Sequence, residues 1–455
     1  MEKTSKTASH PLPLAVIVLA AGKGTRMYSD LPKVLHPVAH APMLVHVLNA
    51  AEQSGAEHVV VVTATDADAV REVAQLVLPT VDLAEQPQQK GTGDAVRCGL
   101  EALPADWHGV VVVAYGDTPL LQAETLRAAA ASVDKHTPVA MVGVEVPVPN
   151  AYGRFVLDAK GQLARIVETK DASEEEKQIT LCNSGITAVR VDVLRDLLPK
   201  LQPNNKQGEY YLTDVVGLAR EAGHPCAVVM GDAAELSGVN SKPELSIAEA
   251  GFQARKRAKM LADGITLIAP DTVFFAFDTE LGRDSVVHPY VVFGPGVTMG
   301  DATIIQSFSH IEGAESEYGA KVGPFARLRP GASLGKGAQV GNFVELKKTR
   351  MDAGAKANHL AYLGDAFIGT QANIGAGTIT CNYDGYSKHV TVIGKQAFIG
   401  SNTALVAPVS IGDGAITAAG SVITEDVEAD SLAIARPIQK AKPGWAKLFR
   451  NSRNN

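Results

Sequence analysis

Residues 321–346 read KVGPFARLRPGASLGKGAQVGNFVEL, and an aliphatic residue recurs in this stretch at every sixth position. The recurring residues are Val322, Leu328, Leu334, Val340 and Leu346, and a glycine follows three of them. A six-residue period is typical of a parallel β-helix, in which each unit supplies one short strand and turns its aliphatic side chain inward. Stacked coils then bury one continuous aliphatic column, which fits an aromatic content of only 5%.

The same period extends to both sides of this stretch. The further members are Val287, Phe293, Met299, Ile305 and Ile311, then Ile368 and Ile374, then Ile393, Ile399, Leu405 and Ile411. The period is interrupted between Leu346 and Leu363 and again between Ile374 and Ile393. We interpret both interruptions as insertions, which leave a solenoid on its surface and often carry its function.

The preceding part of the chain follows a different pattern, in which strand-like and helix-like segments alternate. Residues 15–20, 58–64 and 110–114 are apolar runs typical of buried strands, and residues 42–53, 92–101 and 123–133 have helical periodicity. This alternation predicts an α/β domain with a mostly parallel sheet covered on both faces, and ligands beyond the carboxyl ends of its strands.

Residues 241–263 are rich in alanine and basic residues at helical spacing, and Gly264 is placed to end the segment. We interpret them as a linker helix. The predicted organisation is therefore an α/β domain over residues 1–240, the linker helix over 241–263 and a β-helix domain over 264–455.

The composition excludes several classes of protein. With 455 residues, 46% of them hydrophobic, and 42 basic against 49 acidic residues, the chain is neither disordered nor a chain-wide nucleic-acid binder. Cys98, Cys182, Cys226 and Cys381 are far apart and form no metal-binding pair, which favours a reducing compartment. The longest apolar run, residues 14–21, is too short to span a bilayer. We expect a cytoplasmic protein without membrane insertion.

A glycine-rich turn, residues 19–27 (LAAGKGTRM), comes directly after the first strand. Glycines let backbone N–H groups approach a phosphate, and Arg26 and Lys33 would add positive charge. The spacing matches neither a P-loop nor a dinucleotide fingerprint, so the turn alone is equally compatible with a plain loop. Asp117 follows the strand at 110–114, where a carboxylate serves either as a metal ligand or as a helix N-cap.

Residues 19–33, LAAGKGTRMYSDLPK, resemble the signature of sugar-nucleotide pyrophosphorylases. Nearly the whole chain resembles the bacterial bifunctional GlmU family, which joins an N-acetylglucosamine-1-phosphate uridylyltransferase to a glucosamine-1-phosphate acetyltransferase. The matching fragments are Gly91-Thr92-Gly93, Tyr115-Gly116-Asp117, Tyr152-Gly153-Arg154, Val167-Glu168, Asn183-Ser184-Gly185, residues 207–211 and Gly238-Val239-Asn240. The resemblance implies a Rossmann-like nucleotidyltransferase domain, a left-handed parallel β-helix and a homotrimer.

The resemblance also implies the residues of a first site. Those that would bind UTP or the sugar nucleotide are Leu19, Ala20, Ala21, Gly22, Lys33, Gln86, Gly91, Thr92, Tyr115, Gly116, Asp117, Gly153, Glu168, Asn183 and Asn240. Asp117 and Asn240 would hold Mg²⁺, which prefers oxygen ligands. We assign Arg26, Lys33 and Asp117 to charge neutralisation in the transition state and expect no general base, because this reaction depends mainly on positioning.

A second predicted site lies in the repeat region. Arg329 and Lys347 are eighteen residues apart, or three six-residue units, so we expect them on one face, one coil apart. His359, near Tyr362 in the first interruption, has a side chain suited to removing a proton from an amine. The resemblance makes His359 the proton acceptor and assigns the amino-sugar phosphate to Arg329, Lys347, Tyr362 and Asn373. It assigns acetyl-CoA to Ala376, Asn382, Tyr383, Ser401, Ala419 and Arg436.

We expect the amine to attack acetyl-CoA directly, without an acyl intermediate on Cys381, and an oxyanion donor near Asn382 or Ser401. The basic tail around Trp445 either reaches coenzyme A phosphates or is a solvated end. The predicted function is acetylation of glucosamine 1-phosphate, followed by uridylylation of the product. Two alternatives stay open: a pyrophosphorylase for another sugar whose β-helix only assembles subunits, and a non-catalytic scaffold that binds sugar nucleotides.

Overall fold

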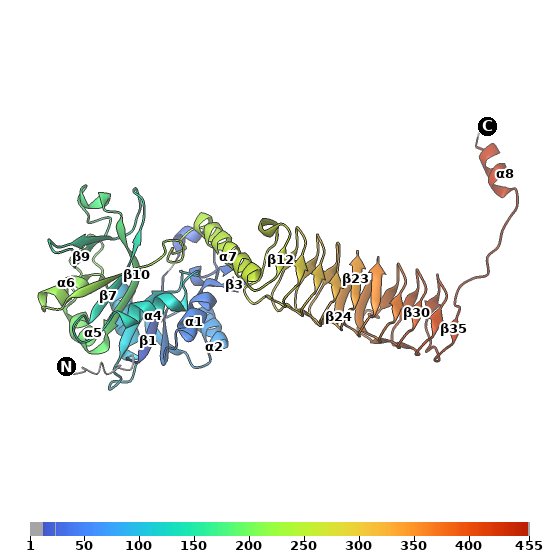
Figure 1. Cartoon of the computed structure of the whole chain (residues 1–455), viewed down its shortest axis with the longest axis horizontal. Helices are drawn as coiled ribbons and strands as arrows, with labels where there is room; N and C mark the ends of the chain where they lie inside the picture. Colours follow the sequence, from blue (N-terminus) through green and yellow to red (C-terminus); the bar gives the residue numbers. More distant parts are fainter. Residues whose placement is uncertain (1–11, 23, 454–455) are drawn as a thin grey trace, which may run out of the picture. The chain divides into compact units, whose positions relative to one another are not determined.

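A computed structural model of the chain describes residues 12–22 and 24–453, so that Lys23 of the glycine-rich turn lies outside the described residues. The chain forms two compact units, Met1–Phe252 and Gln253–Asn455 (Figure 1). The division falls inside helix α7 (Lys242–Ala262), which occupies the segment predicted as a helix and is followed by Gly264 at φ +91°. The domain limits at residues 240 and 264 stay a prediction.

The first unit is built on a nine-stranded sheet whose main order is β11-β7-β10-β6-β1-β4-β5. Its strands are β1 (Leu14–Leu19), β4 (His58–Ala64), β5 (Asp82–Gln86), β6 (Val110–Tyr115), β7 (Val139–Glu145), β8 (Arg154–Leu157), β9 (Leu163–Val167), β10 (Leu181–Arg190) and β11 (Cys226–Met230). Strand β1 is parallel to both of its neighbours, β4 and β6, whereas β10 is antiparallel to β6 and β7. The sheet is therefore mixed.

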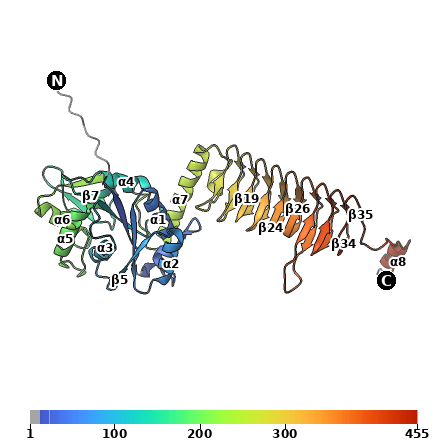
Figure 2. The same cartoon turned by 90° about the horizontal axis from the view of Figure 1, so that it is seen from below.

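Helices cover both faces of this sheet (Figure 2). They are α1 (Met43–Gln53), α2 (Asp68–Val77), α3 (Thr92–Glu101), α4 (Ala123–Ala131), α5 (Val191–Leu197) and α6 (Asp214–Glu221). Alternate residues of β1 belong to different cores: Val16 and Val18 pack with α1, α2 and α4, and Ile17 packs with α3, α5 and α6. The predicted α/β layers are confirmed.

The second unit is a parallel β-helix with three faces. Its first face is formed by β12 (Thr266–Leu267), β14 (Val286–Val287), β17 (Ile304–Ile305), β20 (Lys321–Val322), β23 (Gln339–Asn342), β25 (Lys356–His359), β27 (Asn373–Ile374), β30 (Phe398–Ile399), β33 (Ile416–Thr417) and β35 (Leu432–Ala433). The predicted inward residues of the six-residue period all lie in one buried cluster, which confirms the interpretation of the repeat.

The second face follows the first along each coil, and the third face closes the coil. The second face contains β15 (Val292–Phe293), β18 (His310–Ile311), β21 (Arg327–Leu328), the starts of β24 (Glu345–Met351) and β26 (Tyr362–Ile368), β28 (Ile379–Cys381), β31 (Ala404–Val406) and β34 (Val422–Ile423). The third contains β13 (Glu280–Leu281), β16 (Thr298–Met299), β19 (Ala314–Ser316), β22 (Ala332–Leu334), the ends of β24 and β26, β29 (Thr391–Ile393) and β32 (Val409–Ile411).

The first interruption of the repeat is not an insertion, and that interpretation was wrong. Strands β24 and β26 pair from Glu345–Tyr362 to Met351–Ile368, so no loop leaves the coil between them. The phase changes because Leu328 pairs with Leu346 and Leu334 with Met351, so this corner has one residue fewer than the corner of the coil before it. Thr349 points inward there, and its hydroxyl bonds the Leu363 carbonyl at 2.8 Å. The second interruption is a real insertion: residues 382–390 leave the coil between β28 and β29, visible as a projecting loop in Figure 2.

Across residues 12–22 and 24–453, no helix combines the length and the apolar character that crossing a membrane requires.

Candidate functional sites

A cavity of about 400 Å³ lies at the carboxyl ends of β1, β5 and β6 in the first unit. It gathers most of the residues predicted for the first site: Leu19, Ala20, Ala21, Gly22, Lys33, Gln86, Gly91, Thr92, Tyr115, Asp117 and Asn240. Val34, Gln89, Ala95 and Glu209 also line it and were not predicted. Val34, Gln89 and Ala95 stand outside the motifs of the sequence analysis, whereas Glu209 belongs to the fragment 207–211 that carries the family resemblance.

Lys33, Asp117 and Asn240 form the polar end of this cavity. The Lys33 ammonium forms an ion pair with Asp117 and donates to Asn240 Oδ1 at 3.1 Å. A carboxylate and an amide oxygen thus converge on one positive charge, although the two residues are far apart in the chain. Oxygen donors of this kind suit a hard divalent cation that takes its other ligands from water and phosphates, so the pair fits Mg²⁺.

The opposite wall of the cavity is held by a buried amide. Gln86 donates through Nε2 to the Gly91 carbonyl at 3.1 Å and to Asp94 Oδ2 at 2.9 Å. Gly91 has φ +109°, and a Cβ there would lie 2.6 Å from the Tyr210 carbonyl oxygen, so only glycine fits. Thr92 Oγ1 accepts the Leu212 N–H at 3.0 Å. Gln86 and Thr92 therefore fix the start of α3 against the cavity.

Gly153, Glu168 and Asn183 lie together on the hairpin β8–β9 and on β10. The Asn183 N–H donates to the Gly153 carbonyl at 2.8 Å, and a Cβ on Gly153 would lie 3.4 Å from Glu168 Oε1. Burial raises the pKa of Glu168, and a hydrogen bond from Thr213 only partly opposes this shift. Burial also raises the pKa of the Tyr115 phenol, with further contributions from Glu168 and Asp117. Tyr115, which lines the cavity, is therefore influenced by acidic residues of both groups.

Five predicted residues do not line the cavity: Gly153, Glu168 and Asn183, which form the group just described, and Gly116 and Arg26. Gly116 is buried and donates its N–H to the Leu19 carbonyl at 3.0 Å, which joins the ends of β6 and β1. Arg26 is exposed in the short turn Thr25–Met27, after Gly22.

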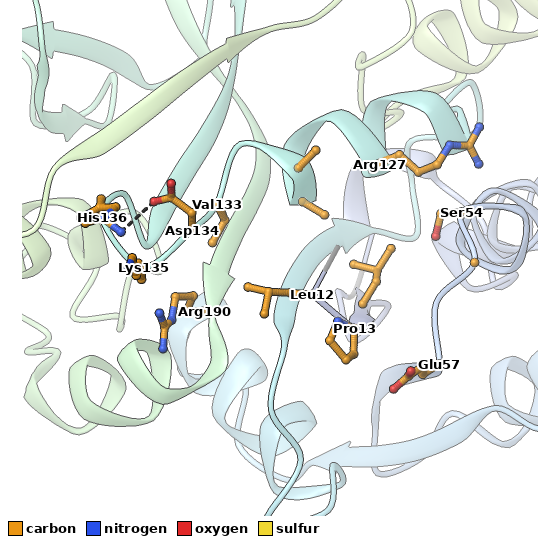
Figure 3. Close-up of a pocket in the computed structure, with 14 residues that line it drawn as sticks. Leu12, Pro13, Ser54, Glu57, Arg127, Val133, Asp134, Lys135, His136 and Arg190 are labelled. Carbon is orange, nitrogen blue, oxygen red and sulfur yellow. Dashed lines mark hydrogen bonds between the residues drawn. The ribbon is translucent and has the colours of Figure 1, made fainter. Parts of the chain in front are cut away.

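A larger cavity of about 890 Å³ opens where β1 begins, at the other edge of the sheet (Figure 3). Figure 3 shows Leu12 and Pro13 in its middle, with Arg127, Lys135 and Arg190 around them. It contains none of the predicted site residues. Size alone would therefore have pointed to a different part of this unit than the sequence motifs do.

In the second unit, one corner of the β-helix collects residues predicted for acyl transfer. Asn342 pairs with His359 across β23 and β25, and the registers of β25–β27, β27–β30 and β30–β33 continue this line one coil at a time. We call it the corner column; its members are Asn342, His359, Ala376, Ser401 and Ala419. The backbone bonds Asn402 N–Ala376 O (2.7 Å) and Gly420 N–Ser401 O (2.8 Å) join its successive coils.

The end of the corner column meets Arg436. Its guanidinium donates through Nη1 to the Ala419 carbonyl at 2.7 Å. The tail beyond it forms helix α8 (Trp445–Asn451), in which the Trp445 and Phe449 rings stack at 5.1 Å. Four predicted acetyl-CoA residues, Ala376, Ser401, Ala419 and Arg436, therefore follow His359 along one line.

The predicted phosphate ligands lie across the second face. Arg327 pairs with Glu345 and Leu328 with Leu346, so Arg329 and Lys347 occupy equivalent positions one coil apart, as the eighteen-residue spacing predicted. Arg329 also donates to Glu345 Oε1 at 2.9 Å. The pKa of Lys347 is lowered, first by a contact with Lys388 and then by Arg329. Three cations thus crowd one place, which favours an anion there.

Lys388 was missed by the sequence analysis. It lies in the loop 382–390, next to Asp384 and His389, whose side chains form an ion pair at 2.7 Å. Asp384 also accepts the backbone N–H groups of Tyr386 and Ser387 at 2.8 and 2.7 Å. These bonds order the loop. The sequence did contain one signal for Lys388, namely its place in the second interruption of the repeat. A cation in an insertion beside a predicted anion site is a candidate ligand.

The remaining predicted residues surround the same face. Tyr362 begins β26 on the second face, and Asn382 donates through Nδ2 to Asp365 at 2.5 Å. Tyr383 donates its hydroxyl to the Gly385 carbonyl at 2.6 Å within the loop. Asn373 instead lies on the first face, on the strand β27 that leads to Ala376.

Cys381 ends β28, at the side of the second face away from the corner column. Arg329 and Lys347 occupy the equivalent position on earlier coils, so the absence of an acyl-cysteine intermediate stays a prediction. Within the described parts of the chain, no three His, Cys, Asp or Glu side chains gather in a way that could hold a metal ion. A metal in the first unit would therefore depend on Asp117, Asn240 and substrate oxygens.

Two family descriptions and many curated proteins match the chain. Residues 16–180 match the MobA-like NTP transferase domain, and residues 391–425 match the bacterial transferase hexapeptide (six repeats). The bifunctional protein GlmU of Zymomonas mobilis subsp. mobilis is 50% identical over 441 residues, which cover 96% of this chain and 98% of the relative. The bifunctional protein GlmU of Paracoccus denitrificans is 52% identical over 434 residues, covering 95% and 96%. With this similarity extending over both units, the chain belongs to the bifunctional GlmU family.

Proposed function

We propose that this protein makes UDP-N-acetylglucosamine in two steps. The second unit acetylates glucosamine 1-phosphate with acetyl-CoA, and the first unit then transfers UMP from UTP to the N-acetylated product and releases pyrophosphate. This proposal rests most strongly on the His359 imidazole of the corner column together with Arg329, Lys347 and Lys388 at the second face, because a β-helix that only assembled subunits would not need these groups.

In the first unit, the sugar phosphate attacks the α-phosphorus of UTP in line and expels pyrophosphate. Gln86, Gly91 and Thr92 hold the nucleotide, while Gly153, Glu168 and Asn183 hold the sugar. Lys33 neutralises charge on the phosphates, which is the main requirement of this reaction. Asp117 and Asn240 would hold Mg²⁺, which supplies further charge neutralisation when bound. Arg26 is assigned to the triphosphate from the family resemblance.

In the second unit, the neutral 2-amine of glucosamine 1-phosphate attacks the thioester carbonyl carbon. The new C–N bond forms, the C–S bond breaks, and His359 takes the proton that the nitrogen loses and passes it to the leaving thiolate. General-base help of this kind is worth roughly 10²–10⁴ in rate. Arg329, Lys347 and Lys388 neutralise the sugar phosphate, with Tyr362 on the same face. Asn373, which lies on the first face, is assigned to the amino sugar from the family resemblance alone.

Acetyl-CoA lies along the corner column in this proposal. From His359 through Ala376 and Ser401 to Ala419 there are three coil steps, and neighbouring strands are spaced about 4.8 Å apart. The column therefore offers roughly 14 Å of corner between the imidazole and Arg436, which suits an extended chain with a thioester at one end and phosphates at the other. Asn382, Tyr383 and Ser401 are the candidates for contacts with the thioester end.

We further propose a homotrimer formed through the β-helix. Tyr290, Phe308, Phe325 and Phe343 occupy the same corner on consecutive coils, with ring centroids 5.1, 4.8 and 5.1 Å apart. These rings are about half exposed, and an apolar strip of this length favours burial against another copy of the chain. The strip runs into the corner column, since Phe343 follows Asn342. A monomer at micromolar concentration by light scattering would contradict this proposal.

The four cysteines are unpaired thiols in the structure, and we propose a cytoplasmic location on that basis.

Two variants test the division of labour. His359→Ala is expected to lower acetyl transfer about 10²–10⁴-fold and to leave uridylyl transfer unchanged. Asp117→Ala is expected to give the reverse pattern. Free thiol released from acetyl-CoA and pyrophosphate released from UTP report the two reactions separately. If the wild-type protein releases no thiol with glucosamine 1-phosphate, the chain is a pyrophosphorylase whose β-helix has another role.

A further inference from the structure

We propose that Asn342 is a positioning residue that sets the tautomer of His359 for proton transfer. The inference rests on the proposed acetyl transfer and adds a residue to it that the sequence analysis did not assign to the site. Asn342 is one coil before His359, at the end of β23, and the two residues are paired in register.

The contact between the two side chains has a defined chemistry. His359 Nδ1 lies 2.8 Å from Asn342 Oδ1. An amide oxygen only accepts hydrogen bonds, so Nδ1 must carry the hydrogen and donate it. A neutral imidazole has one N–H, and Nε2 is therefore left with a free lone pair. That lone pair is what a base needs in order to accept a proton from an attacking amine.

The backbone holds this pair firmly. The Leu360 N–H donates to the Asn342 carbonyl at 3.0 Å, which ties the two coils together at the site. Gly341 lets them approach, because a Cβ there would lie 2.0 Å from the Asn358 carbonyl oxygen. Phe343 and Leu360, the next residues after the pair, both have left-handed conformations at φ +57° and φ +50°. The two chains therefore turn the corner in the same way, and the side chains before them stay side by side.

His359 depends on this contact because its surroundings provide little other constraint. The residue is exposed at the corner. An exposed imidazole without a partner exchanges between tautomers and ring orientations, and only the tautomer with its hydrogen on Nδ1 leaves Nε2 free to act as a base. A fixed acceptor on the preceding coil selects that arrangement before the substrate binds, which reduces the ordering required in the transition state.

The test compares three variants by the kinetics of acetyl transfer. Asn342→Leu keeps the approximate volume and removes the acceptor, and we expect kcat to fall about 10–100-fold, a part of the full contribution of a general base. KM for glucosamine 1-phosphate and for acetyl-CoA should change by less than about 2-fold, because the contact acts on the base and not on the substrates. Asn342→Asp keeps an acceptor oxygen at the same place and should retain kcat within about 3-fold.

A matched control is Gln339→Leu, which removes an amide from the same strand β23 without touching the imidazole, and it should leave both constants unchanged. Uridylyl transfer, measured on the same samples, reports that each variant is folded. An equal fall of kcat in Asn342→Leu and Asn342→Asp would overturn the inference. In that case the acceptor oxygen that aspartate keeps would make no difference, and the role of Asn342 would be purely structural. An Asn342→Leu variant with normal kcat would overturn it as well. If His359→Ala retains acetyl transfer, the proposed function itself fails. This outcome differs from the two Asn342 results, which overturn only the inference about Asn342.

Discussion

The two candidate sites are assembled in opposite ways. In the first unit, Lys33 meets Asn240, a residue 207 positions away, at the edge of a sheet whose strand order differs from the chain order. In the β-helix, His359 meets Asn342, 17 positions away, and each further partner follows after one more coil. Sequence distance therefore says little about proximity in the first unit and nearly fixes it in the second.

The reason is the geometry of the repeat. Each coil contacts only its neighbours, so a residue's surroundings are set by the positions one coil before and after it. A local change in the β-helix should therefore have local and predictable effects. A change in the cavity of the first unit should affect several segments that share one buried polar network.

The largest expected effect comes from Gly341→Ala. Its new Cβ would lie 2.0 Å from a backbone oxygen of the next coil, so the coils must separate next to His359. We expect a destabilisation of about 3 kcal/mol or more and the loss of acetyl transfer. Uridylyl transfer should persist. Thermal unfolding together with both assays tests this prediction, and a variant with normal acetyl transfer would contradict it.

The matched control is Gly217→Ala on helix α6. No atom lies within 4 Å of the position that its Cβ would take. Alanine is the better helix former by about 1 kcal/mol, so this variant should be as stable as the wild type or more stable. The contrast between the two glycines measures how tightly the coils are stacked.

Gln86→Leu should have the next largest effect, this time in the first unit. It removes the donor to Gly91 and Asp94: the Gly91 carbonyl keeps the Ala95 N–H, but the buried Asp94 Oδ2 loses its partner. The penalty for such groups is about 1–3 kcal/mol. A penalty of this size, about 1–3 kcal/mol, in substrate binding lowers kcat/KM for uridylyl transfer about 5–150-fold. Steady-state kinetics with varied UTP checks this, with acetyl transfer as the unaffected reference; an unchanged kcat/KM would show that Gln86 does not support the nucleotide site.

Glu168→Gln should separate stability from activity. Burial raises the pKa of Glu168 in the folded state, so its ionised form opposes folding. This penalty is absent below the ordinary pKa of the carboxyl, grows as the pH rises toward the folded-state value and is complete above it. The variant should therefore be more stable than the wild type near neutral pH, with a smaller difference in acid. KM for the sugar phosphate should rise. Melting curves at several pH values measure the stability difference between the variant and the wild type. A difference that grows in acid would contradict the prediction.

The smallest expected effect is that of Asp384→Asn in the loop 382–390. The asparagine keeps an acceptor for Tyr386 and Ser387 and removes the ion pair with His389. Exposed ion pairs contribute about 0.2–1 kcal/mol, so KM for glucosamine 1-phosphate should rise by up to about 5-fold through a less ordered Lys388.

The pH dependence of this effect has a definite direction. The backbone N–H of Ser387 first, and then His389, hold the pKa of Asp384 well below its usual range. The carboxylate therefore supports the loop above its ordinary pKa and loses this role only as the pH falls through the lowered value. Tyr386→Ser at the loop tip, where the side chain is 97% exposed, is the control. A KM for Asp384→Asn equal to that of this control would show that the ion pair does not position Lys388.

Much of the fold could be predicted because each unit repeats a simple pattern. Residues 58–64 and 92–101 form β4 and α3 as predicted, and the six-residue period marked the inward side chains of the β-helix. The antiparallel β10 was not predicted, because an apolar run in the sequence does not show whether its strand pairs parallel or antiparallel with its neighbours. The first interruption was misjudged because a corner shortened by one residue shifts the phase of the period as an insertion would.

The sequence by itself determined that an aliphatic column would be buried in stacked coils and that Arg329 and Lys347 would be neighbours, since a repeat converts spacing into position. Only the tertiary structure decided which groups meet Lys33, because the order of strands in a sheet depends on long-range packing. It also decided that Lys388 turns back toward Lys347 and that an amide oxygen lies against the imidazole of His359. These contacts depend on loop conformation and side-chain direction, which no spacing in the chain specifies.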